Sequence, residues 1–409
     1  MIAIGQSLVT IVVFLLVLGT IILIHELGHF VVARLAGVKV LEFAIGFPPR
    51  ARVLHRGKPS AYELQRPPRP DPPLPPNIGS GSPEAEAFLE RARRDDADRR
   101  GTEYTLNWLP IGGFVKLEGE DGDDDDPHSF THASLLTRQV ILVAGVVMNL
   151  LLAFVIFTGI ALFAEPGLGL VVKDVSPGSP AATAGLQSGD LLVAVNGQQH
   201  SAFDSHPDEA MINDLRANAG KPVTLTIRHP DGQVEQIDVT LRAPTATEPG
   251  ALGVTIQSVE PFGTVSRSPA DAVATGARQT VEAFGLILGG LGDLGRSIVT
   301  SPTTAPPAAG PVGIGFQLGD ILWSFGPLYV LYMAGLLSAN LALVNILPFP
   351  PLDGGRMLVI ALKAIPRYGP RISLRAERMT YAVGFVALFA FLIWITVFDV
   401  ARQVGGGTP

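Results

Sequence analysis

The chain has 409 residues, of which 47% are hydrophobic and only 16% charged, and its mean hydropathy is +0.35. Soluble domains carry roughly 25% charged residues, so this composition excludes an ordinary soluble protein and indicates a membrane protein with polar segments attached. The net charge of −7 leaves no sign of the basic surface that nucleic-acid-binding proteins show. The absence of cysteine excludes disulfides and thiolate metal ligands.

The first predicted element is an apolar helix near Val9 to Val32, which exceeds the roughly 20 residues needed to cross a bilayer. The helix lacks the positively charged start and the small-residue cleavage site of a signal peptide. We therefore assign residues 1–33 to a retained transmembrane helix that carries polar residues near its end.

Those polar residues are His25-Glu26-Leu27-Gly28-His29, which have the H-E-x-x-H pattern of zincins. Residues four apart on a helix share one face, so His25 and His29 can bind one metal ion, for which zinc is suited. Glu26 beside them can take a proton from a water that the metal activates. Ionisable residues inside a membrane are costly and usually functional, which favours this interpretation over a structural pair of hydrogen-bonded histidines.

The next segment, 34–133, is predicted to be a polar loop with β structure at 43–54 and 104–117, forming a hairpin or small sheet beside the membrane. Between these stretches, 66–100 is rich in Pro, Ala, Arg and Asp, which is typical of a disordered or extended linker. The acidic run at 121–126 lacks the alternating ligands and distal Glu of a calcium loop, so we interpret it as a solvated tip.

The second apolar helix lies near Val140 to Phe163, within a transmembrane segment at 134–165. A module at 166–245 follows, in which strands, a short capped helix, an Asn-Gly turn and an Asp-Gly turn alternate. Their order, and the pattern from Pro180 to Gly197, resemble a PDZ domain of the bacterial protease type.

PDZ domains bind peptides by strand addition and hold the terminal carboxylate with backbone N–H groups. In this module we expect the carboxylate cradle at Gly167, Leu168 and Gly169. An empty groove, in a domain that only restricts access, is the alternative. A connecting segment at 246–321 follows, and its interrupted apolar pattern over 270–300 favours an amphipathic interfacial helix.

The third span, near Leu328 to Leu347 within 322–362, leads into Asp353, which follows three prolines and precedes two glycines. A break in a helix at membrane depth is tolerated only where the backbone is buried in protein or lines a wet cavity. Because a catalytic zinc needs three protein ligands and an open position, we expect Asp353 to be the third ligand. An N-cap role for Asp353, on a helix that begins at Gly354, is the alternative.

A short loop at 363–379 and a fourth span near Tyr381 to Phe398, within 380–401, complete the chain. Lys and Arg are concentrated after the first span and in 363–379, which predicts that both loops are cytoplasmic and that the middle segment and both termini are external. The predicted fold is a multi-pass α-helical membrane protein with four transmembrane helices, a membrane-associated β-hairpin or sheet and one external, β-rich α+β PDZ domain.

Taken in order, these motifs resemble the site-2 proteases, which are zinc metalloproteases that cut within membranes, and in particular the bacterial regulator-of-sigma-E protease type. The resemblance covers nearly the whole chain. Besides the PDZ-like module, the matching pieces are His25 to His29, Leu109 to Val115, Gly145 to Asn149, Gly310 to Ile314, and Asn345 to Gly354.

The resemblance implies that His25, His29 and Asp353 bind Zn²⁺, and that Glu26 is the general base and later the proton donor. It also implies a re-entrant strand that pairs with an unwound substrate helix, because a helical peptide hides its carbonyls in intrahelical hydrogen bonds. The substrate-binding residues so assigned are Asn345, Asn340, Gly112, Gly113 and Phe114.

The implied activity is peptide-bond hydrolysis within single-span proteins, such as an anti-sigma factor or signal-peptide remnants, in a bacterial cytoplasmic (inner) membrane. The expected partners are these substrates, the lipid bilayer and peptide C-termini at the PDZ domain on the extracytoplasmic side, with no nucleic acid. A catalytically silent PDZ scaffold is the alternative, and a zinc transporter is disfavoured because spans two and four have almost no ionisable residues. A single PDZ domain and the insertion at 66–100 depart from the family pattern and affect substrate selection.

Overall fold

The computed structural model describes residues 2–58, 74–75, 82–89, 101–120, 126–203, 207–243, 250–265, 267–301, 305–369 and 372–404. The chain forms two compact units, of which one combines Met1–Ala153 with Ala283–Pro409 and the other is Phe154–Glu282. The linker predicted at 66–100 and the acidic run predicted at 121–126 lie outside the described residues, apart from 74–75, 82–89 and Asp126.

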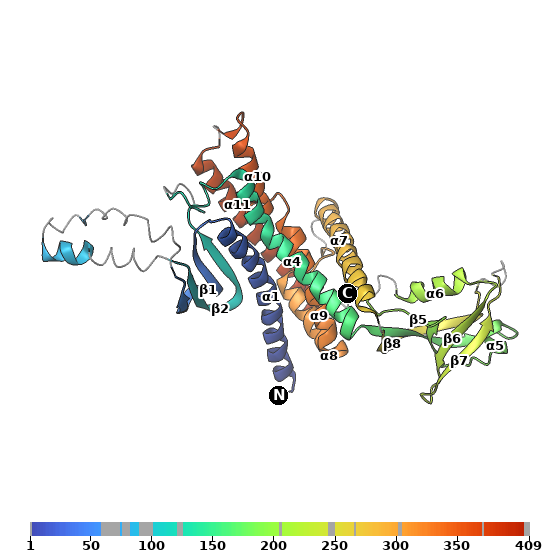
Figure 1. Ribbon diagram of the computed structural model, residues 1–409. Coiled ribbons are helices and arrows are strands. Elements are labelled where there is room, and N and C mark those ends of the chain that lie inside the picture. The colour runs from blue at the N-terminus through green and yellow to red at the C-terminus, as the bar shows by residue number, and fades with distance from the viewer. Residues whose placement is uncertain are drawn as a thin grey trace. The chain divides into compact units, whose positions relative to one another are not determined.

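Among the described residues, four helices are long and apolar enough to cross a membrane, as the sequence predicted. Leu, Val, Ile and Phe side chains are exposed along them, which suits contact with lipid rather than water. The four helices are α1 (Ile2–Leu35), α4 (Leu135–Phe163), α9 (Pro327–Asn345) and α11 (Leu374–Val404) (Figure 1).

Three further helices are α7 (Pro269–Thr300), α8 (Pro311–Phe325) and α10 (Asp353–Ala364). Gly310 has no side chain with which to cap α8, and Asp399 of α11 supplies the missing acceptor. Its buried carboxylate accepts hydrogen bonds from the N–H groups of Gly310 at 3.3 Å and Gly313 at 2.8 Å. This contact fixes the start of α8 against the last spanning helix.

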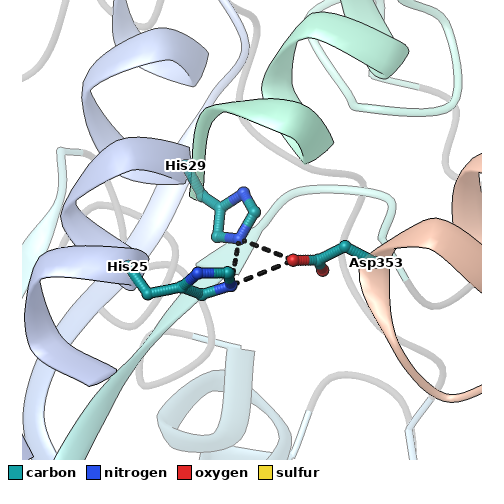
Figure 2. Close-up of side chains that lie close together, drawn as sticks. All are labelled: His25, His29 and Asp353. Carbon is teal, nitrogen blue, oxygen red and sulfur yellow. Dashed lines mark hydrogen bonds and ion pairs between the residues drawn. The ribbon is translucent and has the colours of Figure 1, made fainter. Parts of the chain in front are cut away.

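Helices α1 and α4 pack closely where α1 carries the histidines. A Cβ atom on Gly28 would lie 2.5 Å from the carbonyl oxygen of Ala144, so only glycine allows this approach without a shift. Close to this contact between α1 and α4, His25 and His29 of α1 lie beside Asp353, the first residue of α10 (Figure 2).

A two-stranded antiparallel sheet, formed by β1 (Val40–Arg56) and β2 (Glu103–Leu117), packs against α1. Gly112 has a φ of 72°, and a Cβ there would lie 2.5 Å from the Ile22 side chain, so glycine is needed both for the backbone angle and for the approach to α1. Trp108, which is 71% exposed, and Leu109 lie on the same strand, so the hairpin presents apolar side chains outward.

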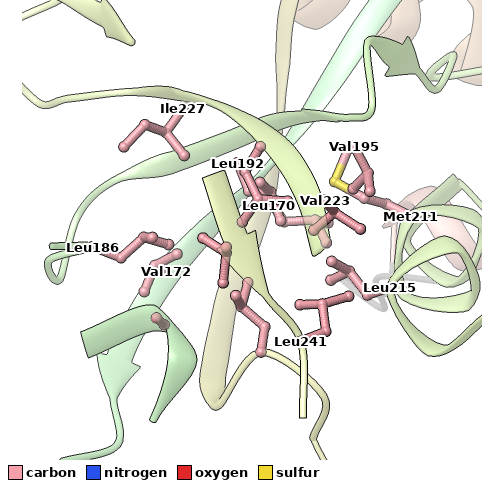
Figure 3. Packing of buried hydrophobic residues seen from close by; sticks show 14 of the residues in the cluster. Leu170, Val172, Leu186, Leu192, Val195, Met211, Leu215, Val223, Ile227 and Leu241 are labelled. Atoms are coloured by element: carbon pink, nitrogen blue, oxygen red, sulfur yellow. The ribbon is translucent and has the colours of Figure 1, made fainter. Parts of the chain in front are cut away.

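The second unit contains a six-stranded antiparallel sheet in the order β7-β6-β4-β3-β8, with β5 paired to β4. Leu170, Leu192 and Leu225 are fully buried in its core, and Met211 of α6 packs with them (Figure 3). The strands are β3 (Pro166–Val175), β4 (Leu191–Val195), β5 (Gln198–Gln199), β6 (Pro222–Arg228), β7 (Val234–Thr240) and β8 (Val254–Thr264), and the helices are α5 (Pro180–Thr183) and α6 (Pro207–Ala217).

Strand β8 lies beyond the boundary at 245 that the sequence indicated for this module. It pairs with β3, with Leu170 opposite Val259 and Val175 opposite Val254. Apolar and polar residues alternate only weakly in 254–264, and the partner strand β3 is about 80 residues earlier in the chain. No local sequence pattern could therefore predict that the two strands pair. The sheet therefore includes part of the predicted connecting segment.

Candidate metal centre

Three potential metal ligands come together from two helices that are far apart in the sequence. His25 Nε2 lies 2.9 Å from Asp353 Oδ2, and His29 Nε2 lies 3.4 Å from the same oxygen. The two histidine Nε2 atoms are 3.2 Å apart (Figure 2). Both histidines are buried, and all three ligand atoms lie within 4.8 Å of one another.

These separations fit a zinc ion. Nitrogen and oxygen ligands lie about 2.0–2.2 Å from tetrahedral zinc, which places neighbouring ligand atoms about 3.3–3.6 Å apart. The three distances in the cluster, 2.9, 3.2 and 3.4 Å, are near the edges of such a tetrahedron. Two neutral imidazoles and one carboxylate also form the donor set expected for a catalytic zinc site, which has three protein ligands and an open position.

Gly145 of α4 keeps the space beside both imidazoles free of side-chain atoms. A Cβ atom at this position would lie 2.5 Å from His29 Nε2 and 2.7 Å from His25 Nε2. Real Cβ atoms do not make contacts this short, so any other residue would displace the two nitrogens that face Asp353. The glycine is therefore part of the geometry of the cluster, although it provides no ligand.

The loop at 346–352 brings Asp353 to the histidines. A Cβ on Gly354 would lie 2.2 Å from the carbonyl oxygen of Ile346, so the turn between α9 and α10 closes only with glycine at that position. The N-cap of α10 is Leu352, and no side chain caps this helix. Asp353 is thus the first residue of α10 and its carboxylate contacts His25, so the alternative in which Asp353 caps the helix is wrong.

The second nitrogen of each imidazole also has a partner, which fixes the orientation of the ring. His29 Nδ1 donates to the carbonyl oxygen of Ile141 at 2.8 Å, and this leaves Nε2 with a lone pair for a metal. The amide group of Asn149 lies 3.3 Å from His25 Nδ1. The Oδ1 atom of Asn149 is buried without a hydrogen-bond partner among the described residues. When the side-chain amide is turned by about 180°, Oδ1 takes the place of Nδ2 and accepts a hydrogen bond from His25 Nδ1–H.

Sequence reasoning assigned no role to Asn149 or to the Ile141 carbonyl. The signal for Asn149 is its polar side chain inside an apolar span, where such residues are usually functional. Ser338 of α9 donates to the Asn149 carbonyl oxygen at 2.8 Å, so this part of α4 is held from both sides. A backbone carbonyl such as that of Ile141 leaves no signal in a sequence.

Glu26 faces the hairpin. Its Oε2 atom accepts a hydrogen bond from the N–H group of Val115 on β2 at 3.2 Å. Gly112 and Gly113 lie against Ile22 and Leu23 of α1, and Phe114 pairs with Ala44 of β1. The structure therefore places the predicted strand segment beside the H-E-x-x-H helix, with its backbone in direct contact with the glutamate.

The two predicted asparagines of α9 differ in position. Asn345, at the end of the helix, has its Nδ2 atom 3.2 Å from His25 Nε2. Asn340 is five residues earlier, and because five residues turn about 140° it lies on another face of the helix. Of the two, only Asn345 belongs to the cluster around His25.

The predicted carboxylate cradle lies inside the sheet of the second unit. Gly167, Leu168 and Gly169 are buried residues of β3, and the Leu168 N–H donates to the carbonyl oxygen of His200 at 3.1 Å. β3 is paired with β4 on one side and β8 on the other. A peptide carboxylate at these residues would first have to displace the His200 contact.

Comparison with known proteins supports a membrane metalloprotease. The chain matches the model of peptidase family M50 over residues 13–65 and 95–391. It is 28% identical to the zinc metalloprotease RasP of Geobacillus kaustophilus, over 97% of this chain and 99% of RasP. It is also 28% identical to the Arabidopsis thaliana protein named "Probable membrane metalloprotease ARASP2, chloroplastic", over 94% of this chain and 78% of that protein.

The chain belongs to peptidase family M50, the site-2 proteases. It is a zinc metalloendopeptidase and a multi-pass membrane protein, which confirms the family, the enzyme class and the zinc cofactor that the sequence indicated.

Proposed function

We propose that this protease cleaves within the transmembrane segments of single-span proteins, with His25, His29 and Asp353 as its zinc ligands and Glu26 as its general base. The observation that carries the proposal is the approach of Asp353 to two histidines 328 and 324 residues away in the sequence, at 2.9 and 3.4 Å. Zinc bound by these residues would lower the pKa of a water and polarise the scissile carbonyl group.

Glu26 supplies the proton transfers. As the residue after His25 it lies within reach of a water at the centre, takes the proton during attack and returns it to the leaving amine. The hydrogen bond from Val115 N–H restricts the carboxylate to one orientation. The side-chain Nδ2 atom of Asn345 lies 3.2 Å from His25 Nε2, one of the proposed zinc ligand atoms. From this position its N–H can donate a hydrogen bond to the oxyanion that develops on the substrate carbonyl.

The β2 strand supports a mechanism for presenting an extended substrate. A substrate helix must unwind before its carbonyls become accessible, and a strand beside the site gives its backbone groups new partners. Within the described residues, β2 pairs with β1 alone, so its other edge is available to a substrate segment around Gly112, Gly113 and Phe114. The exposed Trp108 and Leu109 on the same strand suit a location in the lipid phase.

The sheet of the second unit is proposed to be a PDZ domain on the extracytoplasmic side of a bacterial inner membrane. Its strands and two short helices are of the number and kind that such a domain needs. We propose that it limits access to substrates whose external part has been trimmed, such as anti-sigma factors or signal-peptide remnants. Because the Leu168 amide is already bonded to His200, exclusion of bulky substrates is favoured over capture of peptide C-termini.

The test is cleavage of a model single-span substrate by the full chain in lipid nanodiscs. Glu26→Gln removes the base but none of the three proposed ligands, so we expect the cleavage rate to fall about 10²–10⁴-fold, with one zinc ion per chain retained. Glu260→Gln, an equivalent change at an exposed residue of β8, should cleave like the wild type.

Equal cleavage by Glu26→Gln and the wild type would contradict the proposed base. If zinc were bound but neither protein formed product from several single-span substrates, the silent scaffold would be the better account. A substrate cut only in its external segment would contradict cleavage within the membrane.

A further inference from the structure

The helix that carries Asp353, α10, packs against the beginning of α4. Met357 and Ile360 are four and seven residues after Asp353, so all three lie on one face of α10. Ile360 belongs to a buried cluster with Ile141 and Leu142 of α4, and Met357 packs against that cluster. The face of α10 on which Asp353 lies is therefore also the face in contact with α4.

One polar contact accompanies this apolar packing. The side chain of Gln139, on α4, donates from Nε2 to the carbonyl oxygen of Met357 at 2.9 Å. Met357 lies inside α10, so its carbonyl oxygen can accept the helical hydrogen bond from residue 361 with one lone pair and the bond from Gln139 with the other. The contact with Gln139 is thus not needed for α10 to form, and its effect is on where α10 lies against α4.

A directional contact matters here because α10 begins without a side-chain cap. Apolar packing is not directional, so the cluster alone would allow the helix to rotate or slide. Arg356 forms an ion pair with Glu120, but both are long side chains that can follow a shift of the helix. Gln139 instead holds a backbone atom of α10, which moves only if the helix moves.

Gln139 also lies close to the residue that orients His29. The carbonyl oxygen of Ile141, two residues later on α4, accepts from His29 Nδ1 at 2.8 Å. Two residues of a helix rise about 3 Å, so a single turn of α4 holds one histidine and the backbone of the helix that carries Asp353. The separation of His29 Nε2 from Asp353 Oδ2, 3.4 Å, is therefore set against one rigid element.

We propose that Gln139 is a positioning residue for Asp353. By fixing the Met357 carbonyl one turn beyond Asp353, it holds the carboxylate at the distance from His29 that a shared zinc ion requires. This inference rests on the proposed function, in which Asp353 is a zinc ligand. A ligand that is held in place before the metal arrives loses less freedom on binding, so removal of the Gln139 contact weakens metal binding.

The experiment measures the zinc affinity of the full chain in nanodiscs by competition with a chelator. Gln139→Met keeps the length of the side chain but cannot donate, and it should lower zinc affinity roughly tenfold, the lower end of the range for residues that support a ligand. Gln139→Ala should lower it as well, which keeps the test valid if one variant folds poorly. Gln317→Met, the same change at an exposed residue of α8, is the matched control and should bind zinc like the wild type.

A second measurement needs no metal. Amide hydrogen exchange in the zinc-free chain should be faster at 353–364 in Gln139→Met than in the wild type, with exchange in α1 unchanged. A role in general stability alone would instead speed up exchange in α1 and α10 together.

Wild-type zinc affinity in both Gln139 variants would overturn the proposal. Equal acceleration of exchange in α1 and α10 would also overturn it, because the loss of zinc would then reflect a loosened fold. Asp353→Ala separates this failure from failure of the proposed function. If Asp353→Ala keeps the wild-type affinity, Asp353 is not a ligand; if it loses zinc while the Gln139 variants do not, the ligand set stands and the positioning role is wrong.

Discussion

At the scale of single residues, the candidate metal centre depends on a position that has no side chain. Gly145 lies where α4 passes beside His25 and His29, and a Cβ there would be within 2.7 Å of both Nε2 atoms. The two imidazoles are held from behind by Ile141 and Asn149 on the same helix. α4 therefore both orients the two proposed histidine ligands and leaves free the space that a metal ion would need.

Gly145→Ala tests this arrangement. The added methyl group would displace both imidazoles. Removing a residue that hydrogen-bonds a metal ligand lowers metal affinity roughly 10–100-fold, and we expect Gly145→Ala to lower zinc affinity at least as much. The measurement is zinc content after dialysis against a graded chelator. Gly159→Ala, on the same helix with nothing within 4 Å of the new methyl, is the control and should bind zinc normally. Equal affinity in both variants would contradict the role given to Gly145.

The sequence could predict part of this site. His25, Glu26 and His29 lie within one helical turn, so their spacing alone defines a shared face. Asp353 was indicated by the prolines and glycines that interrupt a membrane helix. The contacts of Asn149 and of the Ile141 carbonyl could not be predicted, because they depend on the rotation of α4 against α1, which no local pattern specifies.

At the scale of elements, the packing of α1 on α4 is what brings these residues together. Gly28 lies between the two histidines in the sequence, on the face of α1 that contacts Ala144. Small residues allow close helix contacts in membranes, where packing rather than water exclusion drives association. The x positions of the H-E-x-x-H motif are thus not interchangeable in this chain.

Gly28→Ala should separate the helices. Its methyl would be 2.5 Å from the Ala144 carbonyl oxygen, so one helix must shift, at a cost of about 1–3 kcal/mol. We expect a lower thermal midpoint in detergent and a lower cleavage rate together. Gly5→Ala, near the start of α1 with no neighbour within 4 Å, should instead leave both unchanged. A Gly28→Ala protein as stable and active as the wild type would show that α1 and α4 do not pack this closely.

The β6–β7 hairpin of the second unit contains a pH-dependent contact. His229 Nδ1 lies 2.8 Å from the buried carboxylate of Asp190, and this hydrogen bond, with a second one to Glu235 at 3.2 Å, raises the pKa of His229 above its usual value of 6.5. A raised pKa means that the folded state binds the proton more tightly than the unfolded state does. The stabilisation is therefore complete below the unfolded pKa and is lost as the pH rises through the folded pKa.

We expect the thermal midpoint of the second unit to fall between neutral and mildly alkaline pH in the wild type, and this part of the fall to be absent in His229→Gln. Unfolding can be followed in the full chain by protease sensitivity of the 166–265 segment. His55→Gln, at a histidine of β1 in the other unit, is the control. An identical pH profile in wild type and His229→Gln would contradict the assignment.

The elements also show where sequence patterns reach their limit. The four spans were predictable because length and hydropathy suffice to define them. Strand β8 was placed in a connecting segment, because its pairing with β3 is nonlocal and three of its central residues, Val259, Glu260 and Pro261, break the expected alternation. α8 was likewise not expected as a separate helix, since only Gly326 divides it from the third span.

At the scale of the whole molecule, the chain combines a membrane unit that contains the candidate metal centre with a second unit built on one sheet. The groups that the proposed mechanism uses all lie in the membrane unit, on α1, β2, α9 and α10. The order of these pieces along the chain made the family recognisable, since each motif alone is short. The match to family M50 over most of the chain agrees with that reasoning.

The central claim is that His25, His29 and Asp353 hold one zinc ion. Zinc content and the X-ray absorption spectrum of the full chain, wild type and Asp353→Ala, test it most directly, with Asp320→Asn on α8 as the control. The account predicts one zinc per wild-type chain with two imidazole ligands and an oxygen shell, unchanged in Asp320→Asn and lost or strongly weakened in Asp353→Ala. An Asp353→Ala protein that keeps the same zinc content and the same spectrum as the wild type would contradict it.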